Sequence, residues 1–542
     1  MTKNNTGCYF GAPYNTRMKR LPISIVCSVL ALLLVSPQLA ARQLPPYGGA
    51  KEYVADLAAR RAQAMTTLGP DTVLVMWSAP TRVYSTDVDY EYRQESNMLY
   101  LSGLEQEDSI LVLIPGAKSK REWLFTRDYD PRREHWNGHT LTAAEVTQQT
   151  GVANVMSLGA LDGFMTALLG GTTPTAAPAI DADDFAAFFE ALKQSKARLA
   201  STVGVGGGPA RGNAGPPAPP IPGSNAAWLA GMQQKATGLT LFNAAPVFST
   251  QRQVKTAYEQ KVLRRSVEIS AEAHAQGMMA ARPDRWEYEV EAAIEYWYMK
   301  NGAMSWGYPS IVGSGPNATT LHYGKSTRQM KNGDLLLVDA AANFQGLTGD
   351  ITRTYPVNGK FSAEQKAIYE IVLAAQNAGI EVTKLNSARA DSVKAMRDVI
   401  TRGLLKLGLI TEAEPGPAQD QQVSTWYTHG PIHGIGVDVH DPLGANFVAG
   451  SAFVMEPGLY IRLQALDDLL KPAPGRGGGA PVEPTQAMKD FVEKVRPMVI
   501  KYKDIGVRIE DSFLMTDKGL ERLSAKAPRT IEEIEKIVGT GK

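Results

Sequence analysis

The sequence contains very little cysteine and no excess of charge of either sign. Its 542 residues include only two cysteines, Cys8 and Cys27. The chain beyond them can therefore form no disulfide and offers no thiol nucleophile or thiolate metal ligand. The 56 basic and 55 acidic side chains leave a formal charge of +1. This balance argues against nucleic acid or an anionic membrane as the main partner.

Long apolar runs are also absent, with one exception near the N-terminus. Residues 18–20 are MKR, residues 21–35 are mostly apolar, and small residues follow up to Ala41. This order is typical of a secretory signal peptide cleaved after Ala41. An uncleaved anchor is the alternative, but the run is shorter than the ~20 residues of a bilayer crossing. We therefore expect residues 1–41 to be removed, and the mature protein to be periplasmic or secreted without a stable membrane anchor.

The length and the ordinary composition, 44% hydrophobic and 20% charged, indicate at least two folded domains. In the N-terminal part, residues 47–248, apolar runs at 71–77, 110–114 and 122–125 predict buried strands. Helices are expected between and after them, including one over 183–199. This part is predicted to be a mixed α/β domain of modest size.

Glycine, proline and alanine dominate two segments, residues 203–223 and residues 471–484. Such segments bury too little apolar area to offset their ordering entropy. We interpret the first as a flexible segment near a domain junction, with a polyproline ligand motif as the alternative. The second is interpreted as a surface insertion within a larger α+β domain, residues 249–542.

In this larger domain we expect two helices, then mainly strands. The first helix follows Ser249, and the second follows Asp284, whose spacing to Glu287 predicts a capping box. From residue 334 onward, apolar strands are expected to dominate up to a terminal helix that starts near Thr530.

Four acidic residues lie on or beside these apolar strands. Asp339 is the one carboxylate within a continuous apolar stretch, and a turn-rich segment leads from it to Asp350. Glu456 ends a further apolar stretch, and Glu510 shares one face of an alternating stretch with Arg508. Strands that fold back would bring the two aspartates together, where they repel unless a cation lies between them. A solvent-exposed pair of aspartates is the alternative on this evidence.

Three of the seven histidines, His429, His433 and His440, lie in the glycine-rich string HGPIHGIGVDVH, between the aspartates and the glutamates. A single histidine here would more often be a core or surface residue, but three together are hard to explain by packing. Four carboxylates and one imidazole could hold two divalent cations, and this donor set favours manganese, with zinc or cobalt as alternatives. Two such cations lower the pKa of a water between them, which favours hydrolysis over redox or group-transfer chemistry.

With these residues the sequence resembles the pita-bread metallopeptidases, the family of methionine aminopeptidase, prolidase and aminopeptidase P. The strings IVGSGPNATTLHY, GDITRTYPVNGKF, HGIGVDVHD, MEPGLY and GVRIED look most like aminopeptidase P. The string YRQESNMLYLSG resembles the N-terminal domain of the same subfamily, which methionine aminopeptidases lack. The resemblance implies an α+β fold, in which a smaller mixed α/β domain precedes a C-terminal pita-bread catalytic domain.

The resemblance also implies a dinuclear exopeptidase that releases the first residue of peptides whose second residue is proline, and that forms a homo-oligomer. Its implied metal ligands are Asp339, Asp350, His433, Glu456 and Glu510, with Asp350 and Glu510 bridging both ions. Glu456 would also transfer the proton, His322 and His440 would stabilise the tetrahedral intermediate, and His429, Tyr460 and Arg508 would shape the proline pocket.

Two alternatives stay open. A prolidase would use the same ligands but cut only dipeptides, and the insertion at 471–484 could alter the accepted peptide length. A non-catalytic peptide- or protein-binding module of this fold is the alternative of another class, although such modules usually lose ligands and this sequence keeps all five.

Overall fold

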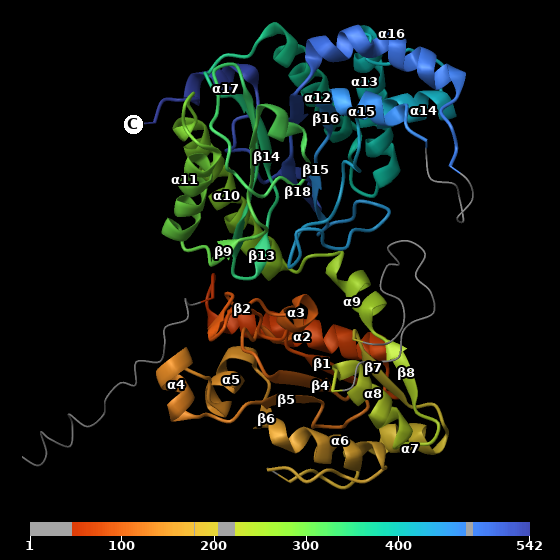
Figure 1. The fold of residues 1–542 in the computed structure, drawn as a ribbon. Coiled ribbons are helices and arrows are strands. Elements are labelled where there is room, and N and C mark those ends of the chain that lie inside the picture. The colour runs from red at the N-terminus through yellow and green to blue at the C-terminus, as the bar shows by residue number, and fades with distance from the viewer. Residues whose placement is uncertain (1–45, 178, 204–222, 473–480, 542) are drawn as a thin grey trace, which may run out of the picture. The chain divides into compact units, whose positions relative to one another are not determined.

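The computed structural model describes residues 46–541 apart from residue 178 and the segments 204–222 and 473–480 (Figure 1). The predicted signal peptide, nearly all of the segment 203–223 and most of the insertion 471–484 lie outside the described residues and stay predictions. Within the described ranges, no helix combines the length and the apolar character needed to cross a membrane.

Residues 130–140 group apart from the rest of the described chain. They contain the short helix α4 (Pro131–Asn137), whose N-terminus is capped by the Asp130 carboxylate, which accepts a hydrogen bond from the Arg132 amide.

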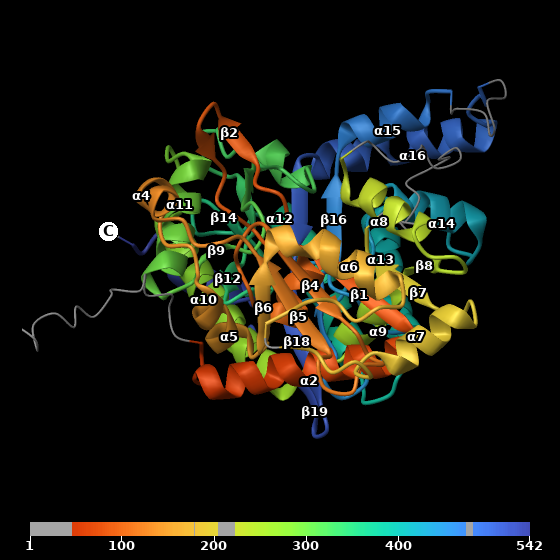
Figure 2. The same cartoon turned by 90° about the horizontal axis from the view of Figure 1, so that it is seen from below.

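A six-stranded mixed sheet organises the N-terminal part, with strand order β6-β5-β4-β1-β7-β8. Its elements are α2 (Ala50–Leu68), β1 (Thr72–Trp77), β2 (Val83–Ser85), β3 (Val88–Asp89), α3 (Ser96–Ser102), β4 (Ser109–Leu113), β5 (Glu122–Thr126), α5 (Ala143–Thr150), β6 (Asn154–Ser157), α6 (Leu161–Leu169), α7 (Ala186–Lys193), β7 (Arg198–Ser201), α8 (Asn225–Gln234), β8 (Thr240–Asn243) and α9 (Ala245–Arg252). The three predicted strands are confirmed as β1, β4 and β5, and they lie side by side (Figure 2).

Helices cover both faces of this sheet. Successive residues of a strand point to opposite faces, so neighbouring residues pack against different helices. In β1, Val73 and Val75 pack with residues of α6, α7 and α8, whereas Leu74 and Met76 pack with residues of α2, α3 and α5. The strands therefore read as continuous apolar runs, as expected for a sheet covered by helices on both faces. The mixed α/β prediction is confirmed.

The predicted helix over 183–199 is wrong at its C-terminal end. Helix α7 ends at Lys193, Ser195 adopts a left-handed backbone (φ 56°), and residues 198–201 form β7. Strand β7 pairs in parallel with both β1 and β8. Its apolar residues Leu199 and Ala200 are buried by these distant partners, which a local helical pattern cannot reveal.

The C-terminal part contains three small sheets that matter for the site, ordered β10-β11-β14, β15-β18-β19 and β16-β17. Its elements are α10 (Ala257–Ala280), α11 (Glu287–Lys300), β9 (Ser305–Trp306), β10 (Ile311–Ser314), β11 (Leu335–Asp339), β12 (Ala342–Phe344), β13 (Leu347–Thr348), β14 (Thr352–Pro356), α12 (Ala363–Val382), α13 (Arg389–Leu407), α14 (Pro417–Ser424), β15 (Ala452–Met455), β16 (Gly458–Ile461), α15 (Leu463–Leu469), α16 (Gln486–Tyr502), β17 (Ile505–Arg508), β18 (Asp511–Thr516), β19 (Gly519–Arg522) and α17 (Ile531–Ile537). Helices α10 and α11 pack together on one side of the strands, and α12 and α13 on the other (Figure 1).

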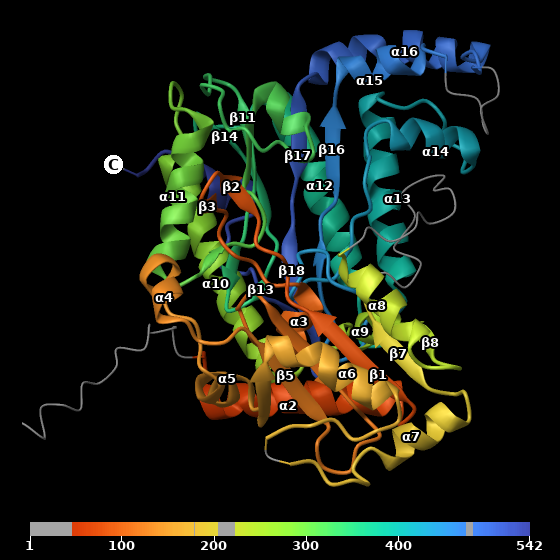
Figure 3. The ribbon, with the colours of Figure 1, turned by 60° about the horizontal axis from the view of Figure 1, so that its bottom comes forward.

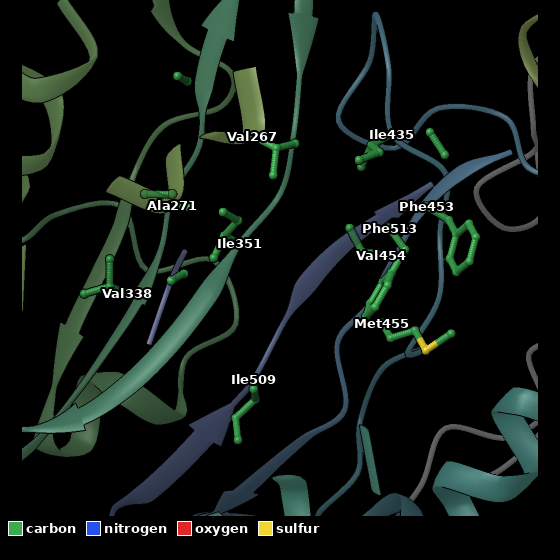
Figure 4. Close-up of a cluster of buried hydrophobic side chains, with 14 of the residues drawn as sticks. Val267, Ala271, Val338, Ile351, Ile435, Phe453, Val454, Met455, Ile509 and Phe513 are labelled. Carbon is green, nitrogen blue, oxygen red and sulfur yellow. The ribbon is translucent and has the colours of Figure 1, made fainter. Parts of the chain in front are cut away.

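Fully buried apolar residues anchor the strands that carry the predicted ligands. Val338, Ile351, Met455 and Ile509 have no exposed surface, and each is the sequence neighbour of one of the four carboxylates (Figure 4). Burial of such a side chain contributes about 1.5–3 kcal/mol. The same strands therefore bury one face in the core and direct their carboxylates to the other.

Three local predictions in this part have different outcomes. The long helix expected after Ser249 is confirmed as α10, which begins at Ala257, where Thr256 caps it in a capping box with Glu259. The capping box at Asp284 is wrong, since Asp284 has φ 69° and Glu287 instead accepts hydrogen bonds from Ser314. The terminal helix is confirmed with Thr530 as its cap.

Strands do not dominate after residue 334, because the long helices α12, α13 and α16 intervene. A capping box of Ser362 with Gln365 marks the start of α12 and could have been found in the sequence.

Candidate active site

The structure brings all five predicted ligands into one cluster. Two groups made only of predicted ligands offer ligand atoms within 4.8 Å of one another, Asp339 with Asp350 and Glu510, and His433 with Glu456 and Glu510; a third group joins Asp350 and His433 to His440. Glu510 belongs to both groups, which is the arrangement expected of a residue that contacts two neighbouring cations. The exposed pair of aspartates is excluded, since Asp339 and Asp350 are both buried.

Asp339 is the last residue of β11, and Asp350 lies just before β14, which pairs with β11. The Tyr308 hydroxyl holds the two aspartates together: it lies 2.6 Å from Asp339 Oδ1 and also bonds Asp350 Oδ1. The backbone of Asp350 is fixed by Ser512, whose Oγ donates to the Asp350 carbonyl (2.6 Å). Tyr308 and Ser512 were not predicted, and no spacing in the sequence marks either residue.

Glu456 and Glu510 lie opposite each other between two antiparallel strand pairs, β15 with β18 and β16 with β17. Thr352 Oγ1 donates to Glu510 Oε2 (2.6 Å), whereas Glu510 Oε1 is buried and has no hydrogen-bond partner in the described part of the chain. A buried carboxylate oxygen without a donor is costly. A cation at this position would satisfy it.

His433 presents a lone pair to three of the carboxylates. Its Nδ1 lies 2.9 Å from the Gly434 carbonyl, which can only accept, so Nδ1 carries the proton. Its Nε2 lies 3.3 Å from Glu456 Oε1, 3.6 Å from Asp350 Oδ2 and 3.8 Å from Glu510 Oε1. Burial, with His440 nearby, lowers the pKa of His433 to about 4. The neutral ring therefore directs a lone pair at carboxylate oxygens, an arrangement that a shared cation would stabilise.

Three of the four carboxyl groups bind protons more tightly than usual when no cation is bound. Burial raises the pKa of Glu456 to about 8, and burial together with the neighbouring carboxylates raises the pKa values of Asp350 and Glu510 well above their usual range. Burial also acts to raise the pKa of Asp339, but Arg508 and Tyr308 lower it overall. The donor set therefore fits cations, which would replace these protons.

Arg508, Tyr460 and His429 form a hydrogen-bonded chain beside the ligands. Arg508 is buried, and its guanidinium donates to Asp339 Oδ2 (2.5 Å) and to the Tyr460 hydroxyl (2.8 Å). Because that hydroxyl accepts from Arg508, its own proton is directed to His429 Nε2, 2.9 Å away. Gly458 makes room for this pair, since a Cβ there would lie 2.5 Å from the Tyr460 oxygen.

His429 completes the chain with its other ring nitrogen. Nδ1 lies 3.1 Å from the Gly430 carbonyl and 3.6 Å from Glu456 Oε2. Burial first, and then Arg508, lower the pKa of His429 to about 4, so the ring is neutral with its Nδ1 proton on the side of Glu456. The predicted pocket roles of His429, Tyr460 and Arg508 stay predictions.

His322 and His440 lie at the exposed edge of the cluster. The His440 ring centroid is 4.1 Å from that of His433. His322 is close enough to His429 and His440 for its positive charge to lower the pKa values of both rings. The segment that carries His440 is held by Asp441, which accepts hydrogen bonds from Arg252 and from Lys255 (2.6 Å). The structure thus places both histidines near the ligands, and their predicted role with the intermediate stays a prediction.

Known protein families match both parts of the chain. The model of metallopeptidase family M24 matches residues 261–517, and the model of the aminopeptidase P N-terminal domain matches residues 57–176. Residues 261–517 therefore form a domain of metallopeptidase family M24. The predicted resemblance and the two-domain fold are confirmed, and the protein is a metallo-exopeptidase of a family that works with divalent metal ions.

Several members of the family are similar over most of their length. The Xaa-Pro aminopeptidase of Haemophilus influenzae is 28% identical over 490 residues, which cover 88% of this chain and 96% of that protein. The structure of an aminopeptidase from Pseudomonas aeruginosa has a TM-score of 0.69 at 29% identity and covers 90% of this chain and 98% of its own. Escherichia coli aminopeptidase P with the inhibitor Pro-Leu has a TM-score of 0.69 at 26% identity, with the same coverage.

Because protons and cations compete for the same oxygens, we expect the affinity of this metallopeptidase for Mn²⁺ to fall as the pH drops below about 8, the raised pKa of Glu456. The expected slope is about tenfold in dissociation constant per pH unit for each proton released. Calorimetric titrations at several pH values, in buffers of different ionisation enthalpy, count these protons. An affinity independent of pH between 6 and 8 would contradict the competition.

Proposed function

We propose that the protein is an Xaa-Pro aminopeptidase that uses two divalent cations, with manganese as the first candidate. The observation that carries the proposal is the pair of overlapping ligand groups that share Glu510, next to the chain from Arg508 to His429. The relatives support the choice of substrate, since those similar along nearly the whole chain are named Xaa-Pro aminopeptidases or aminopeptidase P.

Asp339, Asp350 and Glu510 would hold one cation, and His433, Glu456 and Glu510 the other, with Asp350 also close enough to His433 to contact both. When bound, the cations supply Lewis-acid polarisation of the scissile carbonyl and lower the pKa of the attacking water. Neighbouring side chains orient the ligands: Tyr308 holds the aspartates, and Thr352 fixes one oxygen of Glu510.

Glu456 is the group that moves the proton. Its Oε1 lies beside His433 and its Oε2 beside His429 Nδ1, so one oxygen can face a cation while the other faces the substrate side. With the cations bound the carboxylate is ionised, so that it can accept a proton from the attacking water and deliver it to the proline nitrogen that leaves. His322 and His440, at the exposed edge, would donate to the oxygen that gains negative charge.

The Xaa-Pro bond explains why a dedicated site is useful. Its nitrogen carries no hydrogen, so a peptidase cannot position the substrate through that N–H group. The ring must be held by shape instead, and the partly exposed ring of neutral His429, which packs against the buried Tyr460, offers a surface beside Glu456. The free amine of the substrate would bind near the carboxylates, which limits cleavage to the first bond.

Mass spectrometry of peptide products tests the proposal. With Mn²⁺ present, we expect purified protein to release only the first residue from an Arg-Pro-Pro peptide, and an Arg-Ala-Pro peptide to be cleaved at least about 100-fold more slowly, because a site built for the ring is left unfilled. Chelation should stop both reactions.

The same experiment separates the alternatives. Cleavage of a Gly-Pro dipeptide without cleavage of the longer peptide would indicate a prolidase. Failure to cleave either peptide with manganese, zinc and cobalt, together with tight peptide binding, would indicate a non-catalytic binding module.

A further inference from the structure

Glu456 and Glu510 lie at a break in an otherwise continuous antiparallel ladder. The register is the same on both sides of the break, so Glu456 lies opposite Glu510 and Pro457 lies opposite Ile509. Strands β16 and β17 continue side by side beyond it (Figure 3). The N–H groups of the two glutamates donate to carbonyls of other segments, at 2.9 and 3.0 Å. The pair Pro457 and Ile509 must therefore provide the ladder hydrogen bonds at this point.

Proline removes one of these two bonds. The Ile509 N–H donates to the Pro457 carbonyl at 3.3 Å, but Pro457 has no N–H with which to return the bond to the Ile509 carbonyl. A buried carbonyl without a donor is unfavourable, and native structures nearly always supply one.

Gln376, on the buried face of α12, supplies the missing donor. Its Nε2 donates to the Ile509 carbonyl at 3.2 Å and to the Met455 carbonyl at 3.0 Å. These two carbonyls belong to the residues immediately before Glu510 and Glu456. One amide nitrogen with two hydrogens thus connects the two strands directly behind their ligands.

The orientation of the Gln376 amide is fixed from its other side. Its Oε1 accepts a hydrogen bond from Arg529 Nη1 at 2.6 Å, and because a guanidinium can only donate, the oxygen must face Arg529 and the nitrogen must face the carbonyls. Arg353, which has no exposed surface, also donates to the Glu510 carbonyl and to Asp511 (2.7 Å). The backbone at Glu510 is therefore held from behind by a buried polar network.

We propose that Gln376 is a positioning residue of the metal centre. By replacing the ladder bond that Pro457 removes, it sets the spacing of Glu456 and Glu510 and so the affinity of the site for its cations. This inference rests on the proposed function of the two glutamates as ligands. Gln376 acts only through the backbone, since its hydrogen bonds go to main-chain carbonyls and to Arg529.

The test compares the substitution Gln376→Met with Gln365→Met in the same helix. Gln365 is also buried and also donates to a main-chain carbonyl, that of Gly333 (2.7 Å), but away from the glutamates. We expect Q376M to raise the dissociation constant for Mn²⁺ at least about tenfold, the usual effect of losing a group that orients ligands. Q365M should stay within about twofold of wild type, although both variants lower the melting temperature. Equal Mn²⁺ affinities of Q376M and wild type would overturn the proposal.

Two further variants keep the test decisive. If Q376M does not fold, Gln376→Glu keeps the side-chain size and the contact with Arg529 while removing the amide donors, and should show the same loss of affinity.

Pro457→Ala restores an N–H opposite Ile509. In a protein that carries this substitution, the loss of Mn²⁺ affinity caused by Q376M should therefore be at least about threefold smaller. An equal loss in both backgrounds would contradict the replacement of the ladder bond. A wild-type protein that binds Mn²⁺ but cleaves no Xaa-Pro peptide would refute the proposed function and leave this inference standing.

Discussion

Replacing Glu456 with glutamine is expected to lower kcat for Xaa-Pro cleavage by about 10³-fold, within the range usually lost with a general acid–base group. Glutamine keeps the size and one acceptor oxygen of the side chain, but it cannot take up a proton from water or pass one to the leaving nitrogen. The two oxygens of Glu456 lie beside His433 and His429, and among the described residues no other carboxylate contacts both of these rings. Steady-state kinetics on an Arg-Pro-Pro peptide measures the change.

The control is Glu493→Gln, the same substitution at an exposed position of α16, which should leave kcat unchanged. The metal content of E456Q must be measured alongside, because the residue also belongs to the ligand cluster. If E456Q keeps its cations and loses less than tenfold in kcat, the proton is transferred by another group. If E456Q loses its cations, the residue is confirmed as a ligand, and added Mn²⁺ at saturating concentration should still fail to restore the rate.

The cluster of predicted ligands could be found in the sequence because its members have local signatures. Asp339, Glu456 and Glu510 interrupt or end apolar strands, and His433 lies in a glycine-rich string, so each is visible within a few residues of sequence. Strand β11 pairs with β14 across the short hairpin of β12 and β13 that separates them in the sequence. What the sequence could not reveal is the set of partners that hold the ligands.

Those partners are distant in sequence and have no pattern of their own. Arg508 reaches Asp339 across 169 residues, and Gln376 reaches the Met455 and Ile509 carbonyls across 79 and 133 residues. The helical periodicity places Gln376 on the buried face of α12. In the sequence alone, nothing explains a polar residue at such a core position. Only the tertiary structure shows that the break at Pro457 requires its amide. The error at residues 198–201 has the same origin, since β7 is a strand because of its partners.

Removing divalent cations is expected to abolish hydrolysis and to destabilise the fold. The cluster buries three carboxylates and partly buries Glu456, and burial and mutual repulsion raise the pKa values of Asp350, Glu456 and Glu510. A carboxyl group whose pKa is higher in the folded than in the unfolded state reduces stability as the pH rises through that interval. For Glu456 the interval runs from its ordinary value of 4.5 to about 8. The chelated protein should therefore melt at lower temperature at pH 8 than at pH 5.5.

Bound cations reverse this loss, because they favour the ionised oxygens. Binding to the folded state alone stabilises it by about 4 kcal/mol at a free concentration about 1,000 times the dissociation constant. Calorimetric melting curves with saturating Mn²⁺ and after chelation should therefore differ by several degrees at pH 8. The pH dependence seen after chelation should largely disappear once the cations are bound.

The substitution Asp350→Asn distinguishes two effects of this carboxyl group, its cost to stability without cations and its contribution to cation binding. Asparagine keeps the shape and can still accept from Tyr308, but it removes a buried carboxyl group whose ionisation is unfavourable without a cation. The chelated variant should therefore be at least as stable as the chelated wild type at pH 8, while Mn²⁺ raises its melting temperature much less. Its activity should fall more than about 100-fold, the upper range for losing a group that merely orients a ligand. If D350N instead gains as much stability from Mn²⁺ as wild type, Asp350 is not a ligand, and the cations are held by the group of His433, Glu456 and Glu510.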